Sequence, residues 1–126
     1  MVYWRSPDSF ALIRTRLLNL EFATQVQLGF LPKSRPNIEG YEFADYSEAA
    51  QRVGGDYFDY ITFAGKPAML GVVVADVTGK GVDAGMVMGM TKADIFSLTE
   101  QDMSTRDIVL KLNRHLCKLL NRQKFI

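Results

Sequence analysis

The fold of this chain is decided by one stretch, Val72-Val73-Val74-Ala75-Asp76-Val77-Thr78-Gly79-Lys80-Gly81. A run of apolar residues ends in an aspartate, and a turn with two glycines follows it. A carboxylate at the end of a buried strand is costly to desolvate unless a positive charge meets it. Magnesium or manganese can supply that charge, because both bind carboxylate and carbonyl oxygens. The stretch therefore predicts a buried strand followed by a metal-binding turn.

A second aspartate lies in a similar turn twenty positions earlier in the chain. Asp56 follows a glycine pair in Arg52-Val53-Gly54-Gly55-Asp56-Tyr57-Phe58-Asp59. Taken alone, Asp76 is compatible with an ordinary tight turn, and the glycine pair with a bulged hairpin strand. Taken together, the two turns predict that both carboxylates converge on one pocket for divalent cations.

Three strands are expected around these turns. Residues 41–46 alternate apolar and polar side chains, residues 53–64 are rich in aromatic residues, and residues 68–75 are continuously apolar. We expect Gly65-Lys66-Pro67 to form the turn of a hairpin. A continuously apolar strand is typical of one that is covered on both faces, as in the centre of a sandwich.

Two helices are expected after the second aspartate. The first runs from Val82 to Glu100, and glycines recur every four residues at positions 81, 85 and 89, which favours close approach of another segment. The second begins near Ser104, where Ser104-x-x-Asp107 is a capping signal. Its apolar face comprises Ile108, Leu112, Leu116 and Leu119.

The remaining chemically interesting side chains favour structural roles. His115 lies in an amphipathic helix, so we expect it at a surface or boundary. Cys117 has no partner motif and is expected to be a packed thiol. Met86, Met88 and Met90 are expected to fill the core.

The N-terminal segment from Ser9 to Leu31 is helical by its periodicity. One stripe has heptad spacing and turns polar toward its end; it comprises Phe10, Ile13, Leu17, Leu20, Thr24, Gln27 and Leu31. A second apolar stripe comprises Leu18, Phe22, Val26 and Phe30. Two apolar faces predict two partners, which we expect to be the chain's own domain and a second copy of the helix. Pro32 and Pro36 are expected to end the helix.

Composition limits the classes of function. The 126 residues suffice for one domain, and the formal net charge of +1 predicts neither a nucleic-acid nor an anionic-membrane partner. The single cysteine excludes an internal disulfide, and no signal peptide is visible, so a cytoplasmic location is expected. The longest uncharged apolar run, Pro67 to Ala75, is too short for a membrane span, so no direct membrane contact is expected.

Four segments resemble the motifs of one known family. Residues 53–59 resemble its GGDYYD motif, and residues 76–84 resemble its DVSGKGxxA motif. Residues 25–32 are similar to its IQxxLLP helix end, and residues 112–116 to its later LN helix. The family is the SpoIIE-like branch of the metal-dependent serine/threonine phosphatases (protein phosphatase 2C type), which are bacterial regulators of partner-switching pathways. The resemblance covers roughly residues 20–126.

The resemblance implies an α+β fold, an αββα sandwich of antiparallel sheets between helix layers that is truncated after the second core helix. Residues 1–32 would form an N-terminal linker or regulatory helix, and residues 33–126 the incomplete N-terminal part of the phosphatase domain. The family supplies at least two further metal-binding aspartates from its C-terminal half. We therefore expect little or no phosphatase activity from these 126 residues alone.

The resemblance also implies a centre of two Mn²⁺ or Mg²⁺ ions. Asp76 would bridge both ions, the Val77 carbonyl would add a ligand, and Asp56 would support the site directly or through water. A metal-activated hydroxide would then attack a phosphoserine or phosphothreonine phosphorus in line. Arg52 and Lys80 are weaker candidates for holding the phosphate. The implied partners are a phosphorylated regulatory protein of the anti-anti-sigma-factor type, an upstream sensor domain and a second copy bound through the N-terminal helix.

Two alternatives stay open. Gly54-Gly55-Asp56-Tyr57-Phe58 partly resembles the signature loop of diguanylate cyclases, although Tyr57 stands where a carboxylate is needed. A nucleotide P-loop is excluded, because Gly79-Lys80 is followed by Gly81 and not by Ser or Thr. The non-enzymatic alternative is a dimerisation module whose N-terminal helix transmits a signal from an upstream sensor.

Overall fold

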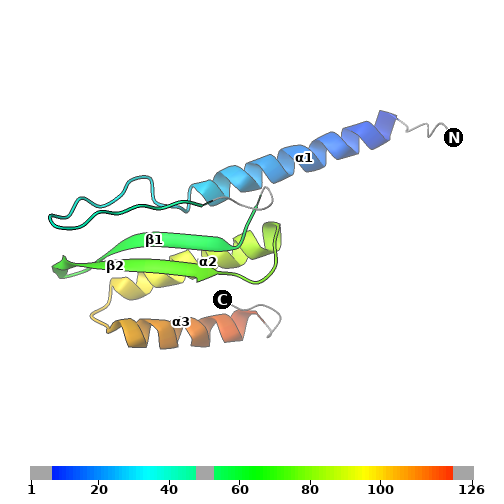
Figure 1. Ribbon diagram of the computed structural model, residues 1–126. Helices are drawn as coiled ribbons and strands as arrows, with labels where there is room; N and C mark the ends of the chain where they lie inside the picture. Colours follow the sequence, from blue (N-terminus) through cyan, green and yellow to red (C-terminus); the bar gives the residue numbers. More distant parts are fainter. Residues whose placement is uncertain (1–6, 48–52, 121–126) are drawn as a thin grey trace.

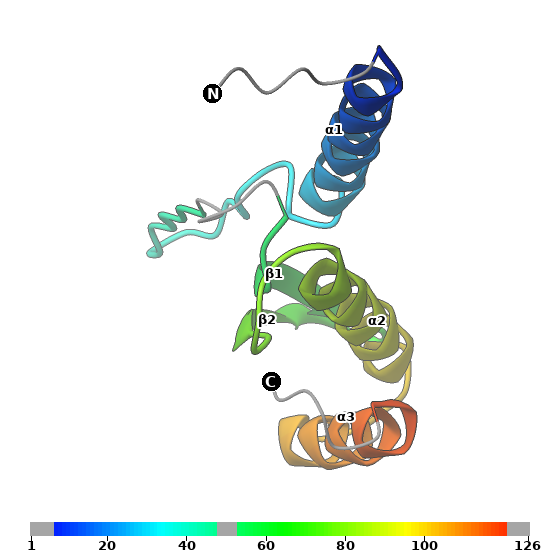
Figure 2. The same cartoon turned by 90° about the vertical axis from the view of Figure 1, so that its right-hand side faces the viewer.

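The computed structural model describes residues 7–47 and 53–120, which Figures 1 and 2 show from two sides. The elements in chain order are α1 (Pro7–Leu28), β1 (Asp56–Phe63), β2 (Lys66–Asp76), α2 (Val82–Thr99) and α3 (Thr105–Leu119). The predicted α+β class is confirmed. The described part of the chain holds a single sheet of two strands, so the αββα sandwich stays a prediction. None of the described helices combines the length and apolar character needed to cross a bilayer.

The sheet is an antiparallel hairpin, as the sequence predicts. Asp56 lies opposite Asp76 at its open end, and the ladder becomes irregular after Thr62, close to the turn. The turn consists of Ala64 and Gly65, and the positive φ of 70° at Gly65 is a conformation that glycine adopts without strain. The turn was expected at 65–67, but Lys66 already belongs to β2.

The hairpin packs one face against α2, which spans nearly the residues predicted for it. The shared core comprises Tyr57, Val77, Ala84, Val87, Met88 and Ile95. A Cβ atom added at Gly85 would lie 2.6 Å from Val53 Cγ1, and one added at Gly89 would lie 2.9 Å from the Phe30 ring. The recurring glycines of α2 therefore allow the close packing that their spacing predicts.

The other face of β2 is open, contrary to expectation. Val72 is 60% exposed and Val74 is 82% exposed, whereas Val73 and Ala75 pack against the core. The prediction that this strand is covered on both faces is thus wrong for the described residues. The physical reason is that α2 covers only the face to which the odd-numbered residues of the strand point.

Residues 41–47 contain no strand, although their alternation predicts one. A strand requires backbone groups of a neighbour to pair with, and alternation of side chains does not supply them. Side chains hold this segment instead. Arg35 Nε donates to Asp45 Oδ2 at 2.6 Å, and the Tyr60 hydroxyl donates to the same oxygen at 3.0 Å.

α3 begins with the predicted cap, since Ser104 Oγ accepts a hydrogen bond from the Asp107 backbone N–H at 3.1 Å. Ile108 and Leu116 are buried, but Leu119 is exposed, so the predicted apolar face holds only in part. Cys117 is also exposed, so the prediction of a packed thiol is wrong. Cys117 directly follows the buried Leu116, so its side chain points to a different side of the helix.

The prediction that the methionines of α2 fill the core is confirmed for one of the three. Met88 is fully buried, whereas Met86 and Met90 are exposed. Residues two apart on a helix point to different sides, so only the middle methionine faces the hairpin.

α1 projects from the rest of the structure, and only its last turns approach α2 (Figure 1). It ends at Leu28, before Pro32, after which Phe30 and Leu31 pack against the core. Eight apolar side chains along it are exposed: Phe10, Leu12, Ile13, Leu17, Leu18, Phe22, Val26 and Leu28. The expected contact with the chain's own domain is confirmed, and the second partner stays a prediction. The candidate Arg52 lies outside the described residues.

Candidate metal centre

The two predicted site aspartates lie on neighbouring strands at the open end of the hairpin. β1 begins at Asp56 and β2 ends at Asp76, and these residues are direct partners in the antiparallel ladder. Side chains of directly opposite residues project from the same face of a sheet, with Cβ atoms about 4.5–5.5 Å apart. The hairpin therefore brings together the two carboxylates that the sequence predicts to converge.

The backbone pairing continues past the strands into both glycine turns. The Val77 N–H donates to the Gly55 carbonyl at 3.2 Å, and the Gly81 N–H donates to the Val53 carbonyl at 3.0 Å. A Cβ atom at Gly55 would overlap the Val77 carbonyl oxygen. Glycine at position 55 is therefore required for this close approach, and it fixes the carbonyl that the sequence analysis names as a ligand.

The electrostatic surroundings of these carboxylates differ from those of a neighbouring one. Asp45 accepts a hydrogen bond from Arg35, which lowers the pKa of its carboxyl group. Asp56 and Asp76 are both exposed, and within residues 7–47 and 53–120 no lysine or arginine forms an ion pair with either. Like charges that are directly opposite on a sheet repel each other. A cation between the two carboxylates would remove that repulsion.

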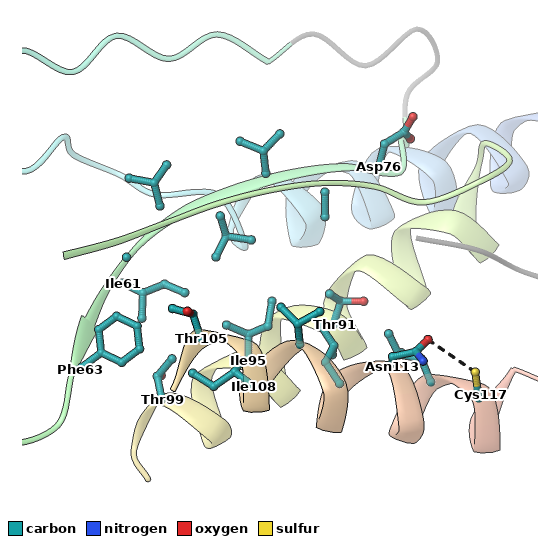
Figure 3. Close-up of a pocket in the computed structure, with 18 of the residues that line it drawn as sticks. Ile61, Phe63, Asp76, Thr91, Ile95, Thr99, Thr105, Ile108, Asn113 and Cys117 are labelled. Carbon is teal, nitrogen blue, oxygen red and sulfur yellow. Dashed lines mark hydrogen bonds between the residues drawn. The ribbon is translucent and has the colours of Figure 1, made fainter. Parts of the chain in front are cut away.

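The described residues do not contain a complete set of metal ligands. No group of three or more His, Cys, Asp or Glu side chains in this part of the chain is close enough together to hold an ion. The two carboxylates open onto a cavity of about 640 Å³ on the outer face of the hairpin, lined also by Tyr46, Phe58 and Tyr60. Figure 3 shows the Asp76 carboxylate directed away from α3.

Gln27 of α1 supports the first glycine turn, a role that the sequence analysis missed. Its side-chain Oε1 accepts from the Gly54 N–H at 2.9 Å, and its Nε2 donates to the Gly54 carbonyl. Nε2 also lies 3.2 Å from Met88 Sδ, and the side chain is nearly buried. The available signal was a polar residue in an apolar heptad stripe. Its partner could not be read from the sequence, because Gly54 is distant along the chain.

A second network ties β1 to α2. Asp59 accepts hydrogen bonds from the Tyr57 hydroxyl at 2.8 Å and from the Tyr60 N–H at 2.9 Å, and it forms an ion pair with Lys92. The Lys92 ammonium also lies 5.6 Å from the centre of the Tyr57 ring. Burial raises the pKa of Tyr57, and the hydrogen bond to Asp59 raises it further. This network faces α2, on the opposite side of β1 from Asp56.

His115 is placed as the sequence predicts, and Lys80 is a surface residue. His115 lies at the boundary between α3 and α2, where its Nδ1 is 2.9 Å from Asp94 Oδ2. Lys80 is exposed in the turn after β2. Neither residue reaches Asp56 or Asp76 through any contact in the described structure.

Comparison with known proteins finds one similar family and two similar relatives. A family model described as stage II sporulation protein E (SpoIIE) matches residues 66–126. The chain is 28% identical over 107 residues to the phosphoserine phosphatase RsbU of Bacillus subtilis (strain 168). This match covers 85% of this chain and 31% of that protein. It is 37% identical over 76 residues to protein IcfG of Synechocystis sp., which covers 60% of this chain and 12% of that protein.

The chain therefore spans less than a third of either relative. The RsbU match covers 85% of this chain, which includes both glycine-flanked aspartate turns and the hairpin that joins them. The family match begins at the first residue of β2 and includes Asp76 and Val77. The chain is thus similar to the SpoIIE family over residues 66–126 and to a phosphoserine phosphatase over most of its length.

Proposed function

We propose that this chain is part of a phosphoprotein serine/threonine phosphatase of a bacterial partner-switching pathway. Asp56, Asp76 and the Val77 carbonyl contribute oxygen ligands to a centre of two Mn²⁺ or Mg²⁺ ions. The observation that carries the proposal is the direct pairing of Asp56 with Asp76 across the hairpin. The name of one relative, a phosphoserine phosphatase, supports the choice of reaction.

The donor set fits hard divalent cations, although only in part. Two carboxylates and a carbonyl are oxygen ligands of the type that Mg²⁺ and Mn²⁺ prefer, and the remaining positions are left to water or to residues beyond those described. When bound, such ions would supply a water acidic enough to lose a proton near neutral pH, which makes it a nucleophile for phosphorus. The chain's own residues hold and orient the ligands: Gly55 lets the Val77 carbonyl approach, and Gln27 fixes the turn before Asp56.

The partners and location follow from the family resemblance. The substrate is a phosphorylated regulatory protein of the anti-anti-sigma-factor type, and an upstream sensor domain acts through α1. The protein works in the cytoplasm. The αββα sandwich accounts for the open outer face of the hairpin, where Val72 and Val74 would be covered by the second sheet.

Metal binding tests the site directly. Mn²⁺ affinity is measured by isothermal titration for the 126-residue chain, for Asp76→Asn and for Asp102→Asn as the control. Asp102 is exposed and pairs with Lys66 near the hairpin turn, far along the strands from Asp76. We expect Asp76→Asn to weaken Mn²⁺ binding by about tenfold or more and the control to leave it unchanged. Equal affinity of all three proteins would refute the assigned site.

Activity tests the reaction class. With Mn²⁺ and a phosphoserine peptide, we expect the 126-residue chain alone to release little or no phosphate. A longer reading frame that supplies further glycine-flanked aspartates is expected to be active, and Asp76→Asn in that protein to be inactive. Metal-dependent turnover by the short chain would show that the described ligands suffice. Conversion of GTP by either protein would instead support the cyclase alternative.

A second, non-catalytic role is favoured by the exposed apolar surface of α1. We propose that two copies associate through the stripe that contains Leu17 and Leu20, and that the helix transmits a signal to the turn held by Gln27. Leu17→Glu is expected to abolish self-association in sedimentation experiments. Asn19→Glu, which lies on neither apolar stripe, is the control. An oligomeric state that is unchanged by Leu17→Glu would rule out this interface.

A further inference from the structure

Helix α3 carries an excess of positive charge. It contains Arg106, Lys111, Arg114 and Lys118 but a single acidic residue, Asp107. The chain as a whole is nearly balanced, with a formal net charge of +1. An element with this excess of cations on a nearly neutral chain concentrates positive potential on one part of the surface.

Three of these cations share one exposed ridge of the helix. Residues 106, 110, 114 and 118 follow one another at four-residue spacing, so their side chains lie next to one another along α3. All four are exposed, including the one apolar member, Leu110. We call this set the basic ridge; it comprises Arg106, Leu110, Arg114 and Lys118. Twelve residues of α-helix separate its ends, which corresponds to about 18 Å.

The cations of the basic ridge form no ion pair within residues 7–47 and 53–120. Asp107, the one acidic residue of the helix, instead accepts a hydrogen bond from the Ser104 hydroxyl at 2.6 Å. Three cations elsewhere in this part of the chain are paired with carboxylates: Arg35 with Asp45, Lys66 with Asp102 and Lys92 with Asp59. The charge of the ridge is therefore available to a partner.

The ridge ends at the same end of the molecule as the candidate metal centre. Figure 3 shows Asn113 and Cys117 at the end of α3 that lies below Asp76, and Arg114 and Lys118 directly follow these two residues. Asp76 and Cys117 also line one cavity between β2 and α3. A molecule held by the last two cations of the ridge would therefore lie near the end of the hairpin that carries both carboxylates.

We propose that the basic ridge docks an acidic stretch of the phosphoprotein substrate. The inference rests on the proposed phosphatase function and deepens it, because it gives the substrate an acidic character near its phosphorylated residue. About five or six residues of extended chain match the length of the ridge. Aspartates or glutamates in that stretch would meet the three cations, and Leu110 offers an apolar contact between them.

An acidic protein segment fits the ridge better than a nucleic acid or an anionic membrane. Binding to either of these depends on a large excess of cations, and this chain has a net charge of only +1. Exposed charges at an interface mainly speed up and orient association, and each contributes little to affinity. Such a surface suits a substrate that must be released again after its phosphate has been removed.

Peptide binding tests the proposal without relying on catalysis. Fluorescence anisotropy at low salt, without added metal, measures the affinity of the 126-residue chain for a phosphoserine peptide flanked by glutamates and for one flanked by lysines. We expect the glutamate-flanked peptide to bind more tightly. Arg114→Gln/Lys118→Gln is expected to weaken its binding by about fivefold or more, and the difference from the parent chain is expected to shrink at high salt.

The matched control is Arg14→Gln/Arg16→Gln, which removes the same charge from exposed positions of α1. We expect it to change the affinity for the glutamate-flanked peptide by less than about twofold. The four substituted residues are all exposed, so both variants are expected to keep the circular dichroism spectrum of the parent chain.

Several results would overturn the proposal. These are unchanged affinity in Arg114→Gln/Lys118→Gln, an equal loss in the α1 variant, and equal binding of the two peptides to the parent chain. Tighter binding of a DNA duplex at the same salt, lost in the α3 variant, would assign the ridge to nucleic acid instead.

Asp76→Asn separates docking from the proposed metal site. We expect it to weaken Mn²⁺ binding and not to weaken binding of the glutamate-flanked peptide. Failure of the peptide experiment with intact Mn²⁺ binding would thus refute the docking surface and leave the proposed function standing.

Discussion

The side-chain amide of Gln27 forms two hydrogen bonds with the backbone of Gly54. Its oxygen accepts from the Gly54 N–H at 2.9 Å, and its nitrogen donates to the Gly54 carbonyl. This contact joins the projecting helix α1 to the turn that precedes Asp56 by two residues. The Gln27 side chain is almost buried, so breaking this contact would leave polar groups without partners. A movement of α1 would therefore shift the backbone of the turn that precedes Asp56.

Replacing Gln27 by leucine is expected to destabilise the protein by about 1–3 kcal/mol. The new side chain is apolar and leaves the partly buried Gly54 N–H and carbonyl without these hydrogen bonds. Urea unfolding measures the change in the free energy of unfolding. Gln25→Leu is the matched control, because Gln25 lies on the same helix and is exposed, and we expect it to change stability by less than about 0.5 kcal/mol. Equal changes in the free energy of unfolding for the two substitutions would show that the hydrogen bonds to Gly54 do not contribute to stability.

Gly55→Ala is expected to disturb the site more than Gly89→Ala. The added methyl group at position 55 overlaps a backbone carbonyl oxygen, that of Val77, which cannot move without breaking the hairpin end. At position 89 it meets the edge of the Phe30 ring, which can rotate or shift. We expect Gly55→Ala to cost about 1–3 kcal/mol and to weaken Mn²⁺ binding, and Gly89→Ala to leave Mn²⁺ binding intact. Unchanged Mn²⁺ affinity in Gly55→Ala would argue against the Val77 carbonyl as a ligand.

Lys92→Met is expected to lower the stability of the protein more than Lys66→Met. Lys92 pairs with Asp59, whose side chain is only 14% exposed, and its loss leaves that carboxylate without a cation. We expect a loss of about 1–3 kcal/mol, because the site is only partly screened by solvent. Lys66 pairs with the freely exposed Asp102, so its removal is expected to cost at most about 1 kcal/mol. Thermal unfolding of the two variants at neutral pH compares them, and a reversed order would contradict the assigned burial of the Asp59 network.

Stability at alkaline pH is expected to depend on Tyr57. The pKa of its hydroxyl is raised in the folded protein above the ordinary value of 10.0, by burial and then by the hydrogen bond to Asp59. The folded state therefore binds this proton more tightly than the unfolded state. The resulting stabilisation is complete below pH 10 and is lost as the pH rises from there toward the folded-state pKa, by about 1.4 kcal/mol per pH unit.

Tyr57→Phe removes this titration, so its stability is expected to fall less steeply above pH 10 than that of the parent chain. Tyr41→Phe is the control, because Tyr41 is exposed. Denaturant unfolding at a series of pH values gives the two slopes. Parallel slopes for Tyr57→Phe and the parent chain would show that the hydroxyl of Tyr57 does not titrate differently in the folded and unfolded states.

Much of the candidate site could be predicted because its signals are local. Asp76 ends an apolar run, Asp56 follows a glycine pair, and a short turn between two strands leaves little choice but an antiparallel hairpin. That hairpin alone brings the two carboxylates face to face. The cap of α3 is local in the same sense, since Ser104 and Asp107 are three residues apart.

The tertiary structure decided what depends on partners distant along the chain. The alternation in residues 41–47 gave no strand, and this segment contacts Tyr60 of β1 through side chains. The apolar run of β2 is covered on one face only. Cys117 is exposed because it follows the buried Leu116 in α3 and therefore points to a different side of the helix. Gln27 is a polar member of the heptad stripe, and in the structure it joins α1 to the turn at Gly54.

By itself, the sequence determined the hairpin, its two facing aspartates and the helices that follow, because hydrophobic period, glycine turns and caps act over a few residues. Only the tertiary structure decided which faces are covered and which polar groups meet, because burial and hydrogen bonding are set by residues brought together from distant positions in the chain.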